Sequence, residues 1–177
     1  MSLKFHPLKR FNLLNFTTQG GIDIKALIRA AKSEDVRHLS PRLREADLKE
    51  LKAAGYPSAE AALYQGLEIS DMCFTGLDPG TGLPAVMFGV VNTEHDIGYN
   101  TIWLLGTDAV PQHGRVFARY TKRWMKTITE MYGTVGNYVD LQNTFYVRWL
   151  GWLGFRQIAT VRHAGTAFGL FIMEGKS

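Results

Sequence analysis

The chain has 177 residues, of which 46% are hydrophobic and 20% are charged, and its formal net charge is +4 at pH 7. This length suits one domain, and so high a hydrophobic share excludes a disordered chain. The longest apolar stretches, such as residues 84–91, are far shorter than the ~20 residues that span a bilayer. We therefore expect a globular domain without a membrane span or a cleaved secretion leader. The modest positive charge permits nucleic acid or anionic cofactors as partners and requires neither.

The thiol and acidic residues argue against a metal site. Cys73 is the only cysteine, so it cannot form an internal disulfide or a cysteine-rich metal site, and we expect a buried structural thiol. Residues 94–96 read Glu-His-Asp, but no second His or Cys follows at ligand spacing. The sequence therefore predicts no metal.

Residues 1–21 differ in composition from the rest of the chain. They contain Lys4, Lys9 and Arg10 but no acidic residue, and residues 19–21 close the segment with Gln-Gly-Gly. This pattern predicts a basic N-terminal arm ahead of a domain over residues 22–177. The arm can bind a partner or be an ordinary terminus, and both interpretations stay open.

The next part of the chain predicts one strand and three helices. The strand lies within residues 22–31, and Ser33 can cap the helix that follows. Strong helix formers fill residues 42–52, and residues 58–70 form an alanine-rich helix behind Ser58.

The middle of the chain then changes to the composition of strands. Residues 72–77 and 84–91 are joined by a turn that contains Pro-Gly, which predicts a hairpin. Residues 84–91 and 101–106 are apolar at successive positions, as in strands covered on both faces. We expect both to be central strands.

Residues 111–132 predict the clearest amphipathic helix. Its apolar residues recur every three or four positions, while the cations Arg115, Arg119, Lys122 and Lys126 share another side, with Arg123 beside them. These cations can bind phosphates of a cofactor or of nucleic acid, or they can form an ordinary solvated face. A strand over 137–141, a helix over 144–153 and strands over 156–162 and 166–173, with a turn at 164–165, complete the chain.

The predicted helix over residues 144–153 is apolar nearly all round. Phe145, Trp149 and Trp152 share one face, and Arg148 is almost its only charge. Such a helix is either buried or lies at an interface. Trp149 and Trp152 are therefore candidate partner-binding residues, with core packing as the equal alternative.

This order of elements resembles the GNAT superfamily of N-acetyltransferase-like proteins. The likeness is carried by residues 28–39, which resemble the opening strand and helix start, and by residues 143–155, where Asn143 precedes a helix that ends in Gly-Phe. It covers roughly residues 22–173. The resemblance implies an α/β (α+β) fold with a mixed, mostly antiparallel central sheet flanked by helices.

The resemblance also implies a site for acetyl-CoA. The family holds the pyrophosphate of the cofactor on a glycine-rich loop at a helix N-terminus, where free N–H groups attract anions. Gln112 and Gly114 can be aligned with that loop, but its second glycine is missing. The implied cofactor-binding residues are Leu105, Thr107, Gln112, His113, Gly114, Arg115 and Asn143.

The catalytic positions depart from the family pattern. Leu150 stands where many members have the tyrosine that protonates the departing thiolate, and Tyr146, four residues earlier, is an imperfect substitute. Residues 101–106 contain no carboxylate for a general base, so Asp108 and His113 are the nearest titratable groups. Asp108 also fits a helix N-cap and His113 an ordinary loop residue.

A narrower resemblance is to the small GNAT-like internal virion proteins of short-tailed bacteriophages. It is carried by residues 42–50 and 103–108, by the basic helix up to Trp124, and by positions within residues 137–155. It implies a component of the virion or of the host cytoplasm that contacts other virion proteins, with homo-oligomers and nucleic acid as further partners, nucleic acid being less favoured. Two functions follow: a virion-associated interaction component with a degenerate acetyl-CoA site, or an active acetyl-CoA-dependent N-acetyltransferase.

Overall fold

One seven-stranded sheet organises the computed structural model, which describes residues 27–175. The strand order is β1-β2-β3-β4-β5-β7-β6, and every neighbouring pair is antiparallel except β4 and β5. The strands are β1 (Ile28–Ala30), β2 (Met72–Leu77), β3 (Pro84–Val91), β4 (Asn100–Gly106), β5 (Val135–Asp140), β6 (Arg156–His163) and β7 (Thr166–Met173). The expected mixed, mostly antiparallel sheet flanked by helices is confirmed.

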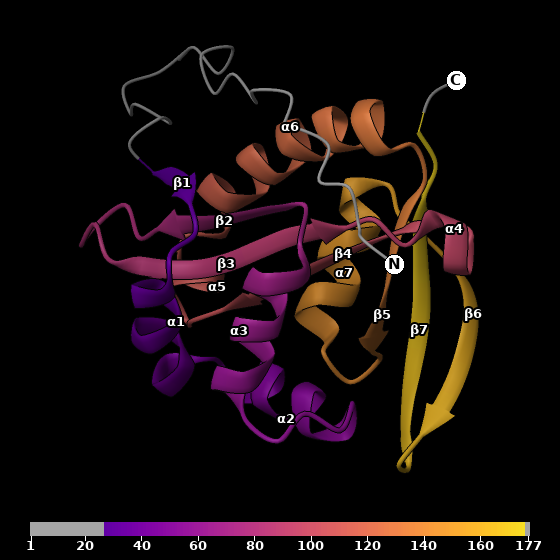
Figure 1. The fold of residues 1–177 in the computed structure, drawn as a ribbon, viewed down its shortest axis with the longest axis horizontal. Helices are drawn as coiled ribbons and strands as arrows, with labels where there is room; N and C mark the ends of the chain where they lie inside the picture. Colours follow the sequence, from indigo (N-terminus) through magenta and orange to yellow (C-terminus); the bar gives the residue numbers. More distant parts are fainter. Residues whose placement is uncertain (1–26, 176–177) are drawn as a thin grey trace, which may run out of the picture.

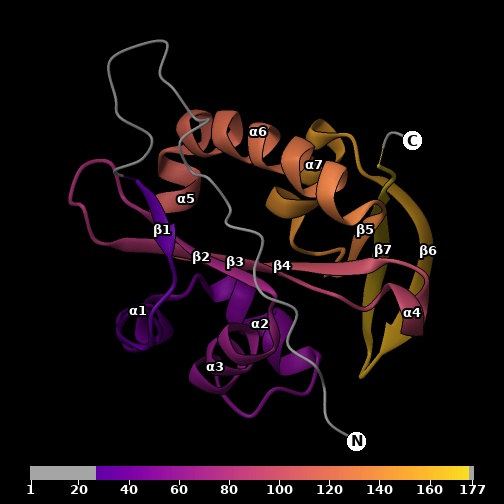
Figure 2. The ribbon, with the colours of Figure 1, turned by 45° about the horizontal axis from the view of Figure 1, so that its top comes forward.

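Helices cover both faces of the sheet (Figures 1 and 2). They are α1 (Ser33–Leu39), α2 (Glu45–Ala53), α3 (Ala59–Ile69), α4 (Glu94–Ile97), α5 (Ala109–Gln112), α6 (Gly114–Tyr132) and α7 (Thr144–Leu153), with a 3₁₀ turn over Ser40–Arg42. Figure 2 shows α1, α2 and α3 below the sheet and α6 and α7 above it. The sheet therefore separates two hydrophobic cores.

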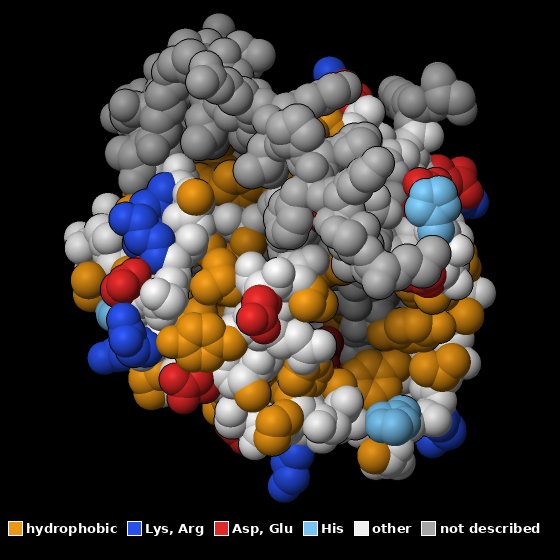
Figure 3. Space-filling model, in the orientation of Figure 1, with side chains coloured by type: hydrophobic (Ala, Val, Ile, Leu, Met, Phe, Trp, Pro, Cys, Tyr) orange, Lys and Arg blue, Asp and Glu red, His pale blue; other side chains and the backbone are white. Residues whose placement is uncertain are grey.

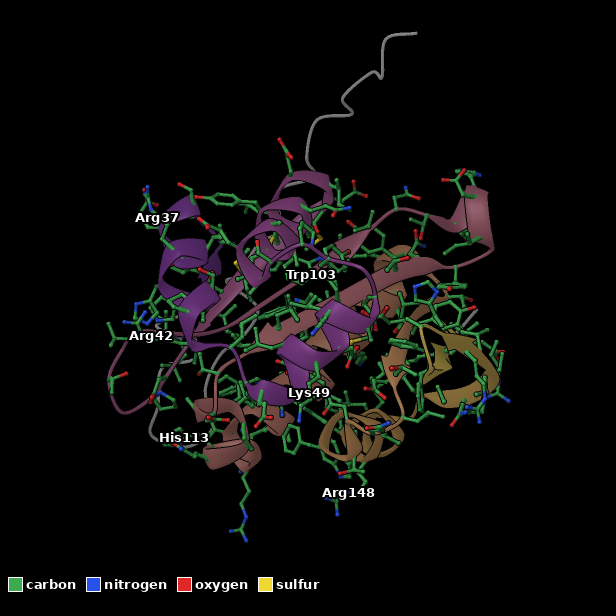
Figure 4. The ribbon with its side chains drawn as sticks, turned by 90° about the horizontal axis from the view of Figure 1, so that it is seen from below. Arg37, Arg42, Lys49, Trp103, His113 and Arg148 are labelled. Carbon is green, nitrogen blue, oxygen red and sulfur yellow. The ribbon has the colours of Figure 1, made fainter. Side chains whose placement is uncertain are left out.

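The core below the sheet joins α1, α2 and α3 to β3 and β4. Val36, Leu39, Leu63 and Met87 are fully buried there. Figure 4 shows this side, with Trp103 between the helices and the strands; its indole N–H donates to Ser70 Oγ at 2.8 Å. Burial of these side chains is the main force that holds the helices to the sheet.

The first helix is fixed by Asp35 rather than by the predicted cap. Ser33 lies inside α1, and the N-cap residue is Lys32, whose backbone N–H donates to Asp35 Oδ2 at 2.9 Å. The same carboxylate accepts from Arg29 at 2.6 Å and from Thr75 at 2.7 Å. Asp35 therefore ties β1, α1 and β2 together. The predicted cap at Ser58 is confirmed, because its Oγ accepts from Ala61 N–H at 3.0 Å.

The core above the sheet is aromatic. Trp124 of α6 meets Phe88 of β3 edge-on, with ring centroids 4.8 Å apart, and lies near Phe74 of β2. Ile128, one turn further along α6, is fully buried. This packing confirms the predicted amphipathic helix, because its apolar residues face the sheet.

Some boundaries differ from the prediction. The helix expected over residues 111–132 is two helices, since α5 ends at Gln112 and α6 begins at Gly114. Residues 94–97 form the single turn α4, an element that the sequence did not predict. Within the described residues, the predicted first strand is β1, residues 28–30, and residues 22–26 of the prediction lie outside the described part.

The turn at Ala164-Gly165 is confirmed, with φ of 47° and 82°. The predicted basic arm, residues 1–21 with Lys4, Lys9 and Arg10, lies outside the described residues.

The sheet opens between β4 and β5. These parallel strands pair only at Asn100 with Val135 and at Thr101 with Gly136, whereas β3 and β4 pair from Val86 with Gly106 to Val91 with Thr101. Figure 1 shows β4 and β5 diverging beyond this junction. Within residues 27–175, the C-terminal half of β4 therefore has an edge without a strand beside it.

Candidate functional site

A cavity lies above this opening, between the sheet and the helices α6 and α7. It encloses about 120 Å³. Its walls are mostly apolar and include Leu104 of β4, Val139 of β5, Trp124 of α6 and Leu150 of α7. The polar side chains that reach it include Glu50, Asn137 and Tyr146. Glu50 comes from α2 on the opposite side of the sheet, so the opening connects the two sides.

A cluster of polar side chains from α2 and α7 lies at the end of β4. The Asp47 carboxylate forms an ion pair with Arg44, and both are buried. Asp47 Oδ2 also accepts from Gly106 N–H at 3.0 Å and from Tyr146 OH at 3.4 Å. The Arg44 guanidinium lies 4.2 Å from the centre of the Tyr146 ring, a cation–π contact. Each charge in the cluster thus has a partner, as buried charges require.

The free edge of β4 is partly occupied by α2. Gly106 C=O accepts from Arg44 N–H at 3.0 Å, while Gly106 N–H donates to Asp47. Backbone groups alternate in direction along a strand. The N–H and C=O groups of Leu104 therefore also point toward the opening, whereas those of Leu105 point toward β3. Thr107 N–H donates to Ala85 O at 2.8 Å. Both backbone groups of Gly106 are therefore used inside the chain.

Glu50 and Tyr146 are among the clustered groups whose pKa values are shifted. Burial, opposed by the hydrogen bond from Asn143 and assisted by the charges of Asp47 and Asp140, raises the pKa of Glu50 to about 7. Burial, followed by the charge of Asp47, raises the pKa of Tyr146 well above its ordinary value. Tyr146 is therefore a neutral phenol, and Glu50 changes charge near neutral pH.

The predicted cofactor residues fall into separate places. Leu105 packs in the core below the sheet, away from the cavity. Asn143 is buried at the start of α7 and donates to Glu50 Oε2 at 3.2 Å. The structure therefore joins Asn143 and Tyr146 to the α2 cluster.

The remaining predicted cofactor residues surround the start of α6. Gln112 ends α5, His113 precedes α6, and Gly114 begins it with open space around its Cα. His113 Nε2 lies 3.4 Å from Asp78 Oδ1 in the β2–β3 turn. Arg115 is exposed on the first turn. A helix start of this kind can attract an anion.

Asp108 occupies the N-cap position of α5, but its side chain makes no capping hydrogen bond. Its negative charge acts on Arg44, where it is one of the smaller causes of the raised pKa of that side chain. Asp108 therefore belongs to the surroundings of the α2 cluster.

The two tryptophans of α7 have different environments. Trp149 lines the cavity, and its buried indole N–H has no hydrogen-bond partner among residues 27–175. Trp152 is 53% exposed, and Lys122 Nζ lies 5.0 Å from the centre of its ring. Core packing therefore accounts for Trp149, while Trp152 remains a candidate for binding a partner.

Sequence reasoning missed Arg44, Asp47 and Glu50 as site residues. They recur every three positions on one side of α2, which is also the pattern of a charged solvated helix face. Only the three-residue spacing could have suggested a shared environment.

Cys73 fits the structural interpretation, because burial, followed by the charge of Asp35, raises the pKa of its thiol to about 12. Within residues 27–175, no group of three or more His, Cys, Asp or Glu side chains is placed to hold a metal ion. In the same part of the chain, no helix is both long and apolar enough to cross a bilayer.

Known structures share this architecture. No family sequence model and no curated protein sequence matches the chain. A GNAT-family acetyltransferase from Bacillus anthracis is 12% identical, with a TM-score of 0.63, and the match covers 84% of this chain and 93% of that one.

Two further matches are to proteins with named activities. The ribosomal-protein-S18-alanine N-acetyltransferase of Escherichia coli is 14% identical, with a TM-score of 0.58 and coverage of 85% and 94%. AAC(6')-Ib, solved with ribostamycin and coenzyme A, is 14% identical, with a TM-score of 0.59 and coverage of 84% and 92%. Identities this low establish the architecture alone. This chain therefore has the fold of the GNAT N-acetyltransferases.

Proposed function

We propose that the chain is a phage-encoded, virion-associated structural or interaction component whose GNAT fold retains a degenerate acetyl-CoA site. The observation that carries the proposal is the occupied edge at Gly106, where Arg44 N–H and the Asp47 carboxylate already use both backbone groups. An extended cofactor arm with amide groups would need such groups as partners when it lies along the end of β4.

Displacing α2 from this edge is unfavourable. It would break the hydrogen bonds of Gly106 with Arg44 N–H and with the Asp47 carboxylate. Polar groups left buried without partners destabilise a protein strongly. The helix start at Gly114 can still attract a phosphate, but the second loop glycine is missing and Leu150 replaces the expected tyrosine. The residues therefore fit the phosphate end of acetyl-CoA and do not fit its arm.

The virion role rests on the resemblance carried by residues 42–50 and 103–108, by the basic helix up to Trp124, and by positions within residues 137–155. It makes other virion proteins the expected partners, in the particle or in the host cytoplasm, with residues 1–21 and Trp152 as the candidate contacts. Mass spectrometry of purified particles of the phage that encodes the chain tests it. Enrichment of the chain in intact, nuclease-treated particles is expected, and its presence only in the soluble lysate would overturn the virion role.

The proposal that the acetyl-CoA site is degenerate is tested by calorimetry of the full chain with acetyl-CoA. We expect no submillimolar binding by a chain that unfolds cooperatively on heating. Submillimolar binding that Gly114→Trp abolishes, and that Gly151→Ala preserves, would overturn the degenerate-site proposal. Gly151 is a suitable control because open space surrounds it on α7, away from the start of α6.

A second candidate, an active acetyl-CoA-dependent N-acetyltransferase, is favoured by one observation. The Glu50 carboxyl lines the cavity, and its pKa of about 7 suits a general base near neutral pH. Its test is thiol release from acetyl-CoA with polyamine, aminoglycoside and peptide amines. Amine-dependent release that Glu50→Gln removes and Glu68→Gln retains would establish the enzyme; no release above hydrolysis would exclude it for these acceptors.

A further inference from the structure

The outward side of α6 carries a continuous row of cations, which we call the α6 stripe. It consists of Arg115, Arg119, Lys122, Arg123 and Lys126, all exposed. With 3.6 residues per turn these positions fall within an arc of about 100°. The opposite side of the helix carries the buried Trp124, Met125 and Ile128. The stripe therefore lies on the side that faces away from the core.

The stripe is poorly neutralised. Within residues 27–175, Lys126 is its only member with a carboxylate partner, Glu130 at 3.9 Å. Like charges four residues apart on a helix destabilise it, and Arg115 and Arg119 form such a pair, as do Arg119 and Arg123. A helix that keeps several unpaired cations on one side creates a local positive field.

Some exposed cations elsewhere on the fold pair with carboxylates, whereas others, such as Lys52, Arg148 and Arg162, have no carboxylate partner within residues 27–175. Arg37 pairs with Glu34, Lys49 with Glu45, and Arg156 with Glu174. On the face shown in Figure 3, Lys and Arg side chains are scattered among hydrophobic and acidic ones. The α6 stripe differs from these cations because its five members lie together on one side of one helix.

An exposed aromatic side chain adjoins the stripe. The helices α6 and α7 lie on the same side of the sheet (Figure 2), and Trp152 of α7 is 53% exposed. Lys122 Nζ lies 5.0 Å from the centre of its ring. An exposed tryptophan beside a row of cations is the combination by which proteins hold single-stranded nucleic acid, with phosphates on the cations and a base on the ring.

We propose that the α6 stripe and Trp152 bind single-stranded nucleic acid without sequence preference. Residues four apart on a helix are separated by about 6 Å along its axis, which is comparable to the separation of successive phosphates in an extended strand. Arg115, Arg119 and Lys122 would each meet a phosphate, and a neighbouring base would stack on Trp152. This activity is independent of acetyl-CoA and of incorporation into a virion.

Two other partners, an acidic protein and a nucleic-acid duplex, would contact the α6 stripe but would place no base on Trp152. An acidic protein would neutralise the cations but would present no base to Trp152. A duplex would offer phosphates, yet its bases are stacked and cannot lie on the ring. A single strand therefore satisfies both the charges and the aromatic ring.

The test is fluorescence anisotropy of a labelled oligothymidylate with the full chain, between about 50 and about 200 mM salt. Three neutralised phosphates predict a slope of about −2 for the logarithm of affinity against that of salt. Arg119→Gln is expected to make this slope shallower by about 0.7. Lys49→Gln, an exposed cation on α2 in the other helical layer (Figure 4), is the matched control and should change nothing.

Substitution of Trp152 tests base stacking separately from the charge of the α6 stripe. Trp152→Ala is expected to weaken binding about fivefold or more with the slope unchanged, while Trp152→Phe keeps most of the affinity. Absence of binding at low salt, or an equal loss in Lys49→Gln, would overturn the proposal. Equal affinity for polyglutamate or for duplex DNA, unaffected by Trp152→Ala, would instead assign the stripe to an acidic protein or to a duplex.

Discussion

The Glu50 carboxyl is held where its charge is poorly solvated and faces other carboxylates. Burial raises its pKa from 4.5 to about 7, with Asp47 and Asp140 adding to the rise. The folded chain therefore retains a proton that the unfolded chain loses between these two pH values. It follows that the stabilisation present below pH 4.5 is lost as pH rises to about 7.

We expect the Glu50 contribution to make the free energy of unfolding about 2 kcal/mol smaller at pH 8 than at pH 5. Glu50→Gln should remove this part of the pH dependence, because the amide carries no charge and can still accept from Asn143. Urea denaturation at both pH values measures it. Glu68→Gln makes the same change at an exposed position, and an equal effect there would contradict the assignment.

Ala164 has a backbone conformation that its side chain disfavours. Its φ of 47° makes it the only non-glycine residue with positive φ in the described part of the chain. Asparagine tolerates this conformation in two-residue hairpin turns, whereas β-branched residues do not. Ala164→Asn should therefore raise the free energy of unfolding by about 0.5 kcal/mol and Ala164→Val should lower it by about 1 kcal/mol. Thermal unfolding of both variants tests this, and the same sign for both would contradict it.

Among the elements, α2 is joined to the end of β4 by hydrogen bonds of Gly106 with Arg44 and Asp47, which also form a buried ion pair with each other. Arg44→Met leaves Asp47 charged and buried without its partner, so we expect a loss of about 3 kcal/mol. Arg44→Met with Asp47→Leu removes both charges and should recover part of that loss. A urea-denaturation cycle with the two single variants measures the coupling, and strictly additive losses would show that the charges do not depend on each other.

The sequence predicted the elements better than the contacts between them. The period of α6 and the apolar runs of β3 and β4 identify these elements, because burial determines both patterns. Arg44, Asp47 and Glu50 were missed because a charged helix face looks the same whether it meets water or partners on another element. Likewise, β4 is apolar whether or not a strand lies beside it, so the opening could be inferred only through the family resemblance.

At the scale of the whole molecule, the two parts of the sheet meet at a narrow junction. In the part of the chain that the structure describes, strands β1–β4 pair with β5, β7 and β6 only through Asn100 with Val135 and Thr101 with Gly136. Asn100 supports the junction, because its side-chain N–H donates to Tyr132 O at 2.7 Å. The opening above the junction exists because the strands separate there, so the junction determines the position of the cavity.

At the junction, Gly136 is the position where alanine would fit least well. An added Cβ would lie 2.3 Å from Ile172 Cδ1 and 2.9 Å from Phe171 O, and this backbone oxygen cannot move without disturbing β7. We expect Gly136→Ala to lower the free energy of unfolding by about 2 kcal/mol. Gly151→Ala is the same chemical change within α7, where open space surrounds the glycine, and should raise it by about 0.5 kcal/mol.

Urea denaturation compares the two alanine variants, and hydrogen exchange locates the effect. Gly136→Ala should speed exchange of the β4 and β5 amides more than that of the β2–β3 amides, because only the junction is strained. A uniform change across the sheet would show that the two parts unfold as one unit and that the junction is not the weak point. If the loss of protection from hydrogen exchange is confined to the β4 and β5 amides, the opening can widen while the two cores stay folded.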